Sequence, residues 1–102
     1  MRIWKLYTAL PEYNEALSGI EAAALEVWEK EFATTTGGFT RYETHGAWVS
    51  GGELYKEDGH VYEVIDFAHT ILPSTMKRFQ ESLRVLHNQQ TVLLTLQQGE
   101  VI

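Results

Sequence analysis

The sequence TTTGGFTRYETHGAW occupies residues Thr34–Trp48, between a segment with helical periodicity and a segment with the alternation of a strand. Consecutive threonines disfavour a helix because β-branching restricts χ1, and the pair Gly37–Gly38 can adopt the positive φ that ends one. The sequence therefore predicts that a helix stops within residues 34–37 and that a strand begins at Gly38. Gly46 is a weak point in that strand because glycine contributes no side chain to packing.

The segment before this stretch predicts a strand followed by a helix. Residues Ile3–Leu10 alternate in the manner of a strand, and Pro11 ends it because proline cannot donate to a strand ladder. Ser18 and Glu21 form a capping box, which predicts a helix over Gly19–Ala33. The buried stripe of that helix is predicted at 3.6-residue spacing: Ile20, Ala23, Ala24, Val27 and Trp28.

The segment after this stretch predicts a hairpin. The strand over Gly38–Ser50 is followed by the turn residues Gly51 and Gly52, and Glu53–Glu57 can pair back across that turn. The sequence Lys56–Gly59 signals either a second turn or a bulge in one continuous strand. The residues of His60–Thr70 alternate most strongly and predict a further strand.

The last third of the chain predicts a helix and a strand. Ser74 is the expected N-cap, and the apolar stripe of the helix consists of Met76, Phe79, Leu83 and Leu86. A strand is expected over Thr91–Gln97, with Val92, Leu94 and Leu96 pointing inward. Val101–Ile102 is expected to add a short terminal strand after the turn at Gly99.

The predicted order of strand, helix, strand, strand, helix and strand is that of an α+β, ferredoxin-like βαββαβ fold. Its four-stranded antiparallel sheet carries both helices on one face. The open face is expected to carry tyrosines and charged residues, or their neighbours if the register shifts by one: Tyr7, Arg41, Tyr62 and Asp66. A bare sheet face that carries tyrosines favours contact with another subunit or a ligand.

The composition limits the classes of function. The 102 residues are expected to form a single domain, residues 1–102, and the net charge of −6 argues against binding DNA, RNA or an anionic membrane. A small nucleotide held by one or two positive residues remains compatible. There is no cysteine, so thiolate catalysis and cysteine-based zinc sites are excluded. Without a signal peptide or an apolar span, a cytoplasmic location is expected.

The candidate binding residues follow from the stretch that ends the first helix. Two glycines and neighbouring hydroxyls can approach an anion and Arg41 can supply charge, although a helix C-terminus is unfavourable for an anion and the glycines also serve simply to end the helix. Trp48 and Tyr42 are candidates for stacking on a ring. The complete predicted ligand-binding set is Thr36, Gly38, Thr40, Arg41, Tyr42, His45 and Trp48.

The sequence predicts neither a metal site nor a cofactor. The four histidines, at positions 45, 60, 69 and 87, form no close pair with the spacing of metal ligands. No motif of nucleophilic catalysis is present, so no catalytic residue is assigned. A carboxylate near His45 or His60 could form an acid–base pair, which keeps an enzymatic function as an alternative.

The chain resembles a group of small uncharacterised phage and bacterial proteins over nearly its whole length. The resemblance is carried by the GGFT segment Gly37–Thr40, by Gly46 and Trp48 in a Gly-x-Trp arrangement, by Glu57 and by Val61–Val64. Small phage proteins of this kind are often counter-defence factors, including oligomers that sequester nucleotide second messengers. The resemblance implies that role for this chain and does not assign its binding residues.

These observations favour a non-enzymatic homo-oligomer that holds a small anionic, nucleotide-like ligand near a subunit interface. One alternative is a protein-binding module that inhibits a host enzyme through a strand edge or an aromatic patch. The other is a small dimeric α/β-barrel-type enzyme in which His45 or His60 is the base.

Overall fold

The structure is a computed structural model that describes residues 1–9, 19–87, 89 and 91–100. The predicted cap Ser18, the strand stop at Pro11 and the predicted terminal strand Val101–Ile102 lie outside the described residues. The elements follow one another in the predicted order: β1 (Arg2–Ala9), α1 (Gly19–Thr36), β2 (Thr40–Ser50), β3 (Glu53–Asp66), α2 (Pro73–Leu86) and β4 (Leu93–Gln98).

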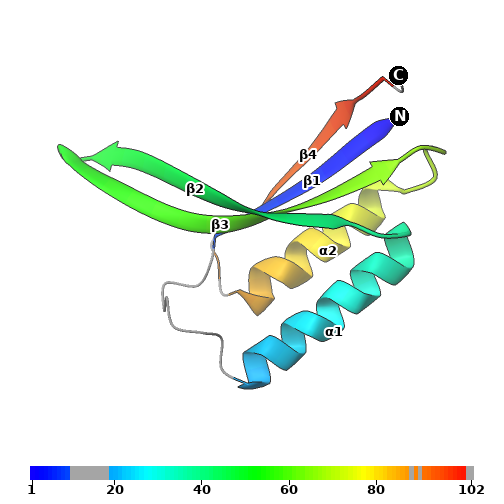
Figure 1. The fold of residues 1–102 in the computed structure, drawn as a ribbon, viewed down its shortest axis with the longest axis horizontal. Helices are drawn as coiled ribbons and strands as arrows, with labels where there is room; N and C mark the ends of the chain where they lie inside the picture. The colour runs from blue at the N-terminus through cyan, green and yellow to red at the C-terminus, as the bar shows by residue number, and fades with distance from the viewer. Residues whose placement is uncertain (10–18, 88, 90, 101–102) are drawn as a thin grey trace.

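The four strands form one antiparallel sheet in the order β2-β3-β1-β4. Both helices cover the same face of the sheet, and the first residues of β1 lie beside the end of β4 (Figure 1). This arrangement confirms the predicted ferredoxin-like α+β fold. Among the described residues, no helix combines the length and the apolar character that a bilayer crossing requires.

Helix α1 is longer than predicted, because it continues through the three threonines to Thr36. The hydroxyl of Thr34 donates to the carbonyl of Lys30 at 2.7 Å. The hydroxyl of Thr36 donates to the carbonyl of Phe32, also at 2.7 Å. These bonds back to the preceding turn make threonine compatible with the helix interior. The helix ends at Gly37, as predicted, where φ is 88° and the amide donates to the carbonyl of Ala33.

The buried face of α1 differs from the predicted stripe. Trp28 is buried as expected, but the described members Ala23, Ala24 and Val27 are exposed. The helix instead buries Leu25, Trp28 and Phe32, which also have helical spacing. The prediction was wrong because two apolar stripes coexist on this helix, and the stripe with larger side chains removes more area from water.

An aromatic cluster forms the centre of the core between the helices and the sheet. The ring of Phe32 stacks on Trp28 with centroids 4.8 Å apart and meets Phe79 edge-on at 5.0 Å. Tyr62 of β3 meets Trp28 edge-on at 5.1 Å. The indole nitrogen of Trp28 donates to the hydroxyl of Ser82 at 2.9 Å, so the only polar atom of that side chain is satisfied.

Helix α2 starts earlier than predicted. Its N-cap is Leu72 and Pro73 is its first residue, so the predicted cap Ser74 lies inside the first turn. Proline is favoured there because its fixed φ suits a helix and its missing amide hydrogen would have no partner. The predicted stripe is confirmed, since Met76, Phe79 and Leu83 are buried.

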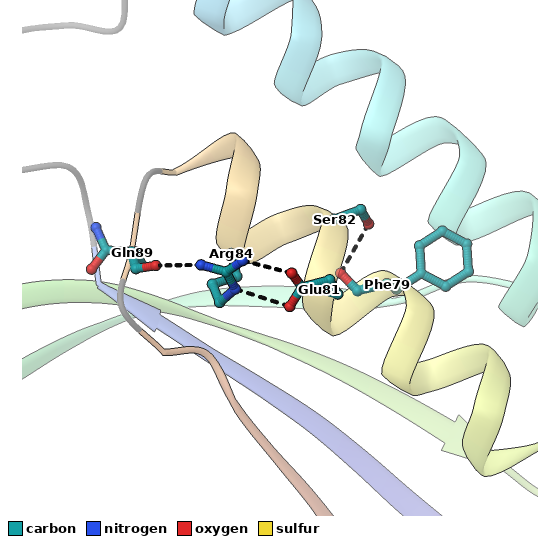
Figure 2. Close-up of polar contacts among 5 residues, drawn as sticks. All are labelled: Phe79, Glu81, Ser82, Arg84 and Gln89. Carbon is teal, nitrogen blue, oxygen red and sulfur yellow. Dashed lines mark hydrogen bonds and ion pairs between the residues drawn. The ribbon is translucent and has the colours of Figure 1, made fainter.

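Hydrogen bonds link the end of α2 to the segment that follows it, as Figure 2 shows. The guanidinium of Arg84 donates two hydrogen bonds to the carboxylate of Glu81 and a third, at 3.2 Å, to the carbonyl of Gln89. The amide of Gln89 in turn donates to the carbonyl of Arg84 at 3.0 Å. This reciprocal contact positions His87, the C-cap residue, against the rest of the molecule.

The strand β3 is continuous, with neither a turn nor a bulge at Lys56–Gly59. Its pairing with β2 keeps one register from Thr40 opposite Glu63 to Ser50 opposite Glu53. The turn uses Gly51 and Gly52, both at positive φ, as the sequence predicted. Among the described residues, the pairing of β3 with β1 runs from Asp66 to Gly59, and the hairpin continues beyond Gly59 as a ribbon of two strands (Figure 1). We call residues 45–58 the hairpin extension.

The open face of the sheet carries Tyr7, as predicted, but the other three residues expected there point toward the helices. Tyr62 and Asp66 are buried on the covered face, and Arg41 lies opposite Tyr62 in the register. The alternative of a register shifted by one residue applies to β2 and β3, where Tyr42 and Val61 take the open face, whereas Tyr7 of β1 keeps the predicted parity. Parity alone could not distinguish the faces, because β3 carries bulky residues on both sides.

Candidate functional site

The predicted ligand-binding residues occupy four separate places, the last of which is the hairpin extension with His45 and Trp48. Thr36 and Gly38 lie at the end of α1, where the hydroxyl of Thr36 already donates to a carbonyl of its own helix. Thr40 and Tyr42 lie on the open face of β2. Arg41 lies on the covered face. The sheet therefore separates its side chain from those of Thr40 and Tyr42.

The charge of Arg41 is compensated within the chain. Its guanidinium donates to the carboxylate of Glu29 on α1 at 2.7 Å, and the same carboxylate oxygen accepts from the hydroxyl of Tyr62 at 2.8 Å. Burial, together with this carboxylate, raises the pKa of the Tyr62 hydroxyl, which therefore stays protonated at neutral pH. We call Glu29, Arg41 and Tyr62 the carboxylate cluster.

A double-mutant cycle tests the carboxylate cluster. Tyr62→Phe and Glu29→Gln are each expected to lower the free energy of unfolding, with a coupling of about 1–2 kcal/mol between them, because the hydrogen bond from the buried hydroxyl ends on a charged group. Urea unfolding of the wild type, both single variants and the double variant measures that coupling. Strictly additive effects would show that the hydroxyl and the carboxylate do not interact in solution.

His45 lies on the hairpin extension and is exposed. Its Nδ1 is 2.7 Å from a carboxylate oxygen of Asp58, which is directly opposite in the register. The hydrogen bond to Asp58 raises the pKa of His45, and the negative charge of Asp58 adds to that effect. His45 is therefore more readily protonated than an ordinary histidine.

Trp48 lies near the tip of the hairpin extension and stacks on Tyr55. The two rings are 5.7 Å apart between centroids and inclined by 17°, and the residues face each other across the strands. Both remain exposed, at 48% and 43% of their surface. Val49 and Leu54 form a second opposed pair on the other side of the ribbon, at 68% and 61% exposed. The hairpin extension therefore presents apolar side chains on both of its faces.

The open face of the sheet is aromatic close to the base of the hairpin extension. Tyr7 of β1 and Tyr42 of β2 lie on either side of Val61 in the register. Both tyrosines are partly exposed, whereas Val61 is 1% exposed. The two tyrosines thus flank a buried apolar residue and remain partly exposed on the open face.

In one copy of the chain, Arg41 and Trp48 cannot bind the same small ligand. They are seven residues apart on one strand, which corresponds to about 23 Å at 3.3 Å per residue, and they point to opposite faces. A site that uses both residues requires a second copy of the chain. The assignment of the seven predicted residues to a ligand remains a prediction.

The structure brings together residues that the sequence analysis did not assign to a site. Glu29 was placed on the outside of its helix, and Tyr62 on the open face of the sheet. Tyr55 could have been found from sequence, because it lies opposite Trp48 when the hairpin turns at Gly51 and Gly52. Among the described residues, no group of three histidine, aspartate or glutamate side chains has an arrangement that could hold a metal ion.

No protein-family model matches the chain. No curated protein matches it in sequence. Solved structures with a similar fold include a phage SAM lyase in complex with S-methyl-5'-thioadenosine, with a TM-score of 0.64 and 14% identity over 94% of this chain and 79% of that one.

Two further structures with a similar fold are CutA proteins. The PII-like protein CutA from a Nostoc species has a TM-score of 0.52 and 16% identity over 98% of this chain and 82% of its own. A CutA1 variant from Pyrococcus horikoshii has a TM-score of 0.54 and 11% identity over 100% of this chain and 86% of its own. Identities this low show a shared fold, and fold alone does not assign a function.

Proposed function

We propose that this protein is a homo-oligomeric binding protein for a small, ring-bearing, nucleotide-like ligand, which is held where the hairpin extension of one copy meets another copy. The observation that carries the proposal is the exposed, stacked pair Trp48 and Tyr55. Large aromatic side chains that remain exposed together mark a surface for a partner or a ring.

The hairpin extension itself supports association with a second copy. Within the described part of the chain, its two strands pair only with each other. An isolated two-stranded ribbon is marginally stable in water, and unpaired strand edges favour further pairing. A second copy that covers the pair Val49 and Leu54 would remove that apolar surface from water and leave the aromatic pair to contact a ring.

The class of ligand is proposed from the aromatic pair and from the comparison of folds. Aromatic side chains stack on any nucleobase, because every base has a π-face. The phage SAM lyase that shares the fold is described with S-methyl-5'-thioadenosine, which supports an adenosine-containing ligand here. Sequestration of a nucleotide signal in the cytoplasm, as a phage counter-defence activity, is the physiological role that we propose for such binding.

Replacement of Trp48 by alanine tests the proposal. We expect the variant to lose the oligomer or to bind adenosine-containing nucleotides roughly 5- to 150-fold more weakly, because a stacking contact contributes about 1–3 kcal/mol. Native mass spectrometry measures the subunit number, and calorimetric titration with adenosine nucleotides and cyclic dinucleotides measures the affinity. Val27→Ala, which removes exposed apolar surface from α1, is the control and should change neither.

Two outcomes would contradict the proposal. One is a wild-type protein that stays monomeric at all concentrations, and the other is a wild-type protein that binds no member of the nucleotide panel. Arg41→Ala distinguishes the role of charge: loss of binding with an unchanged oligomer would place Arg41 in the site. Unchanged binding would restrict Arg41 to its contact with Glu29.

The second candidate function is an enzyme that acts on a ligand of the same class. It is favoured by His60, since burial and the charge of Arg41 lower the pKa of this histidine, and a neutral imidazole can serve as a base. The net charge of −6 also suits a cationic ligand such as a sulfonium compound. Release of S-methyl-5'-thioadenosine from S-adenosylmethionine, followed by mass spectrometry, would support this function, and no release would reject it.

A further inference from the structure

Two histidines on the covered side of the sheet, away from the hairpin extension, are close enough to influence each other electrostatically. His87 is the C-cap residue of α2 and is 3% exposed, and His60 is half-buried on β3 beside Thr8 of β1. The Nδ1 atom of His60 and the Nε2 atom of His87 are both buried without a hydrogen-bond partner in the described part of the chain. Buried polar atoms are paired in the great majority of cases, so two unpaired imidazole nitrogens require an explanation.

The charges that surround His60 are mixed. Glu43 lies opposite His60 on β2, and Arg41 on the same strand and Glu29 on α1 also act on it. Its neighbour on β1 is Thr8, which carries no charge. Burial lowers the pKa of His60 and Arg41 lowers it further, while the two carboxylates only partly offset both effects. His60 is therefore neutral at pH 7.

The surroundings of His87 also oppose a positive charge. Burial lowers its pKa, the proximity of His60 lowers it further, and Glu29 only partly offsets this. Arg84, on the helix that His87 caps, carries its own positive charge, which is paired with Glu81. On β4, the residues that share the covered face are Leu94, Leu96 and Gln98, none of which carries a charge. The C-terminal end of a helix favours a cation, yet burial outweighs that preference here.

We propose that His60 and His87 form an acid-sensitive joint that holds the end of α2 against the sheet while both imidazoles are neutral and releases it when they take up protons. A protonated imidazole has two N–H donors and needs acceptors for both. Glu29, the carboxylate that acts on both rings, already accepts from Arg41 and Tyr62, and Glu43, opposite His60, is exposed to solvent. The two protonated rings would also repel each other. The arrangement in which the end of α2 is held against the sheet therefore loses stability in acid.

The sign of the effect follows from proton linkage. An unfolded histidine takes up a proton near pH 6.5, whereas His60 and His87 resist protonation in the folded state. The unfolded state therefore binds more protons below that pH, and stability falls as the pH is lowered through about 6.5. His45 has the opposite sign, because its pKa is raised, and its stabilising contact with Asp58 is lost as the pH rises.

The test is a pair of measurements at pH 7.5, 6.5 and 5.5. In the wild type we expect the melting temperature to fall across this range. We also expect hydrogen exchange at residues 83–87 to increase before exchange in β1 and β3 does. NMR titration of the histidine ring protons should show both buried imidazoles protonating below the pH of about 6.5 at which an unfolded histidine does.

Matched variants assign the response to the two rings. His60→Gln combined with His87→Gln should remove most of the acid-induced fall in melting temperature, whereas His45→Asn should retain it. The NMR titration needs only the wild type, so it decides the question even if the double variant does not fold. The proposal is overturned if the two rings titrate at or above pH 6.5, or if the double variant has the wild-type acid response.

Discussion

Replacement of Phe32 by alanine is expected to lower the free energy of unfolding by about 3–5 kcal/mol, the usual loss for a buried phenylalanine. Phe32 is fully buried, and its ring contacts Trp28, Phe39, Tyr62 and Phe79. Trp28 and Phe79 belong to the two helices, Tyr62 belongs to β3, and Phe39 directly precedes β2. The cavity left by the substitution would therefore lie between the two helices and the sheet.

A loss of that size is a large part of the roughly 5–15 kcal/mol by which domains of this kind are stable. Urea unfolding followed by circular dichroism measures it, and an unchanged slope with denaturant would show that the folded state is otherwise intact. Val27→Ala, on the exposed side of the same helix, should change stability by less than about 0.5 kcal/mol. Equal effects of the two substitutions would contradict the observed orientation of α1.

Gly59→Ala is expected to lower the free energy of unfolding by about 2–3 kcal/mol, toward the upper end of the range for inserting a methyl group into a packed site. A Cβ atom at Gly59 would lie 2.5 Å from the carbonyl oxygen of Thr8 and 2.9 Å from the hydroxyl of Thr44. The first contact is with backbone, which cannot rotate away. The strands would have to separate where the hairpin extension leaves the sheet.

Gly46→Ala provides the matched control, because it lies in the same hairpin and the added Cβ would meet the carbonyl oxygen of Glu57 at an ordinary 3.7 Å. Thermal unfolding of both variants, with hydrogen exchange at β1 and β3, measures the effect. We expect Gly59→Ala to expose the amides of both strands and Gly46→Ala to leave them protected. A stable Gly59→Ala variant with wild-type exchange would show that β1 and β3 are farther apart than the structure has them.

The candidate site was predicted from the sequence only in part. Trp48 is predicted as a candidate for stacking on a ring, and the structure places it in an exposed stacked pair with Tyr55. Arg41 was chosen for its charge, but the structure pairs that charge with Glu29. Twelve residues separate the two in sequence, and no local pattern indicates such a contact. The buried pair His60 and His87 could not be predicted for the same reason.

The sequence by itself determined the order of the elements, the stop at Gly37, the turn at Gly51 and Gly52 and the buried stripe of α2. These features depend on backbone preferences and on periodicity, which act over a few residues. Only the tertiary structure decided which side of α1 is buried and which face of β3 meets the helices. Those choices depend on the area that distant segments remove from water together, and a helix or strand with apolar residues on both sides does not specify them.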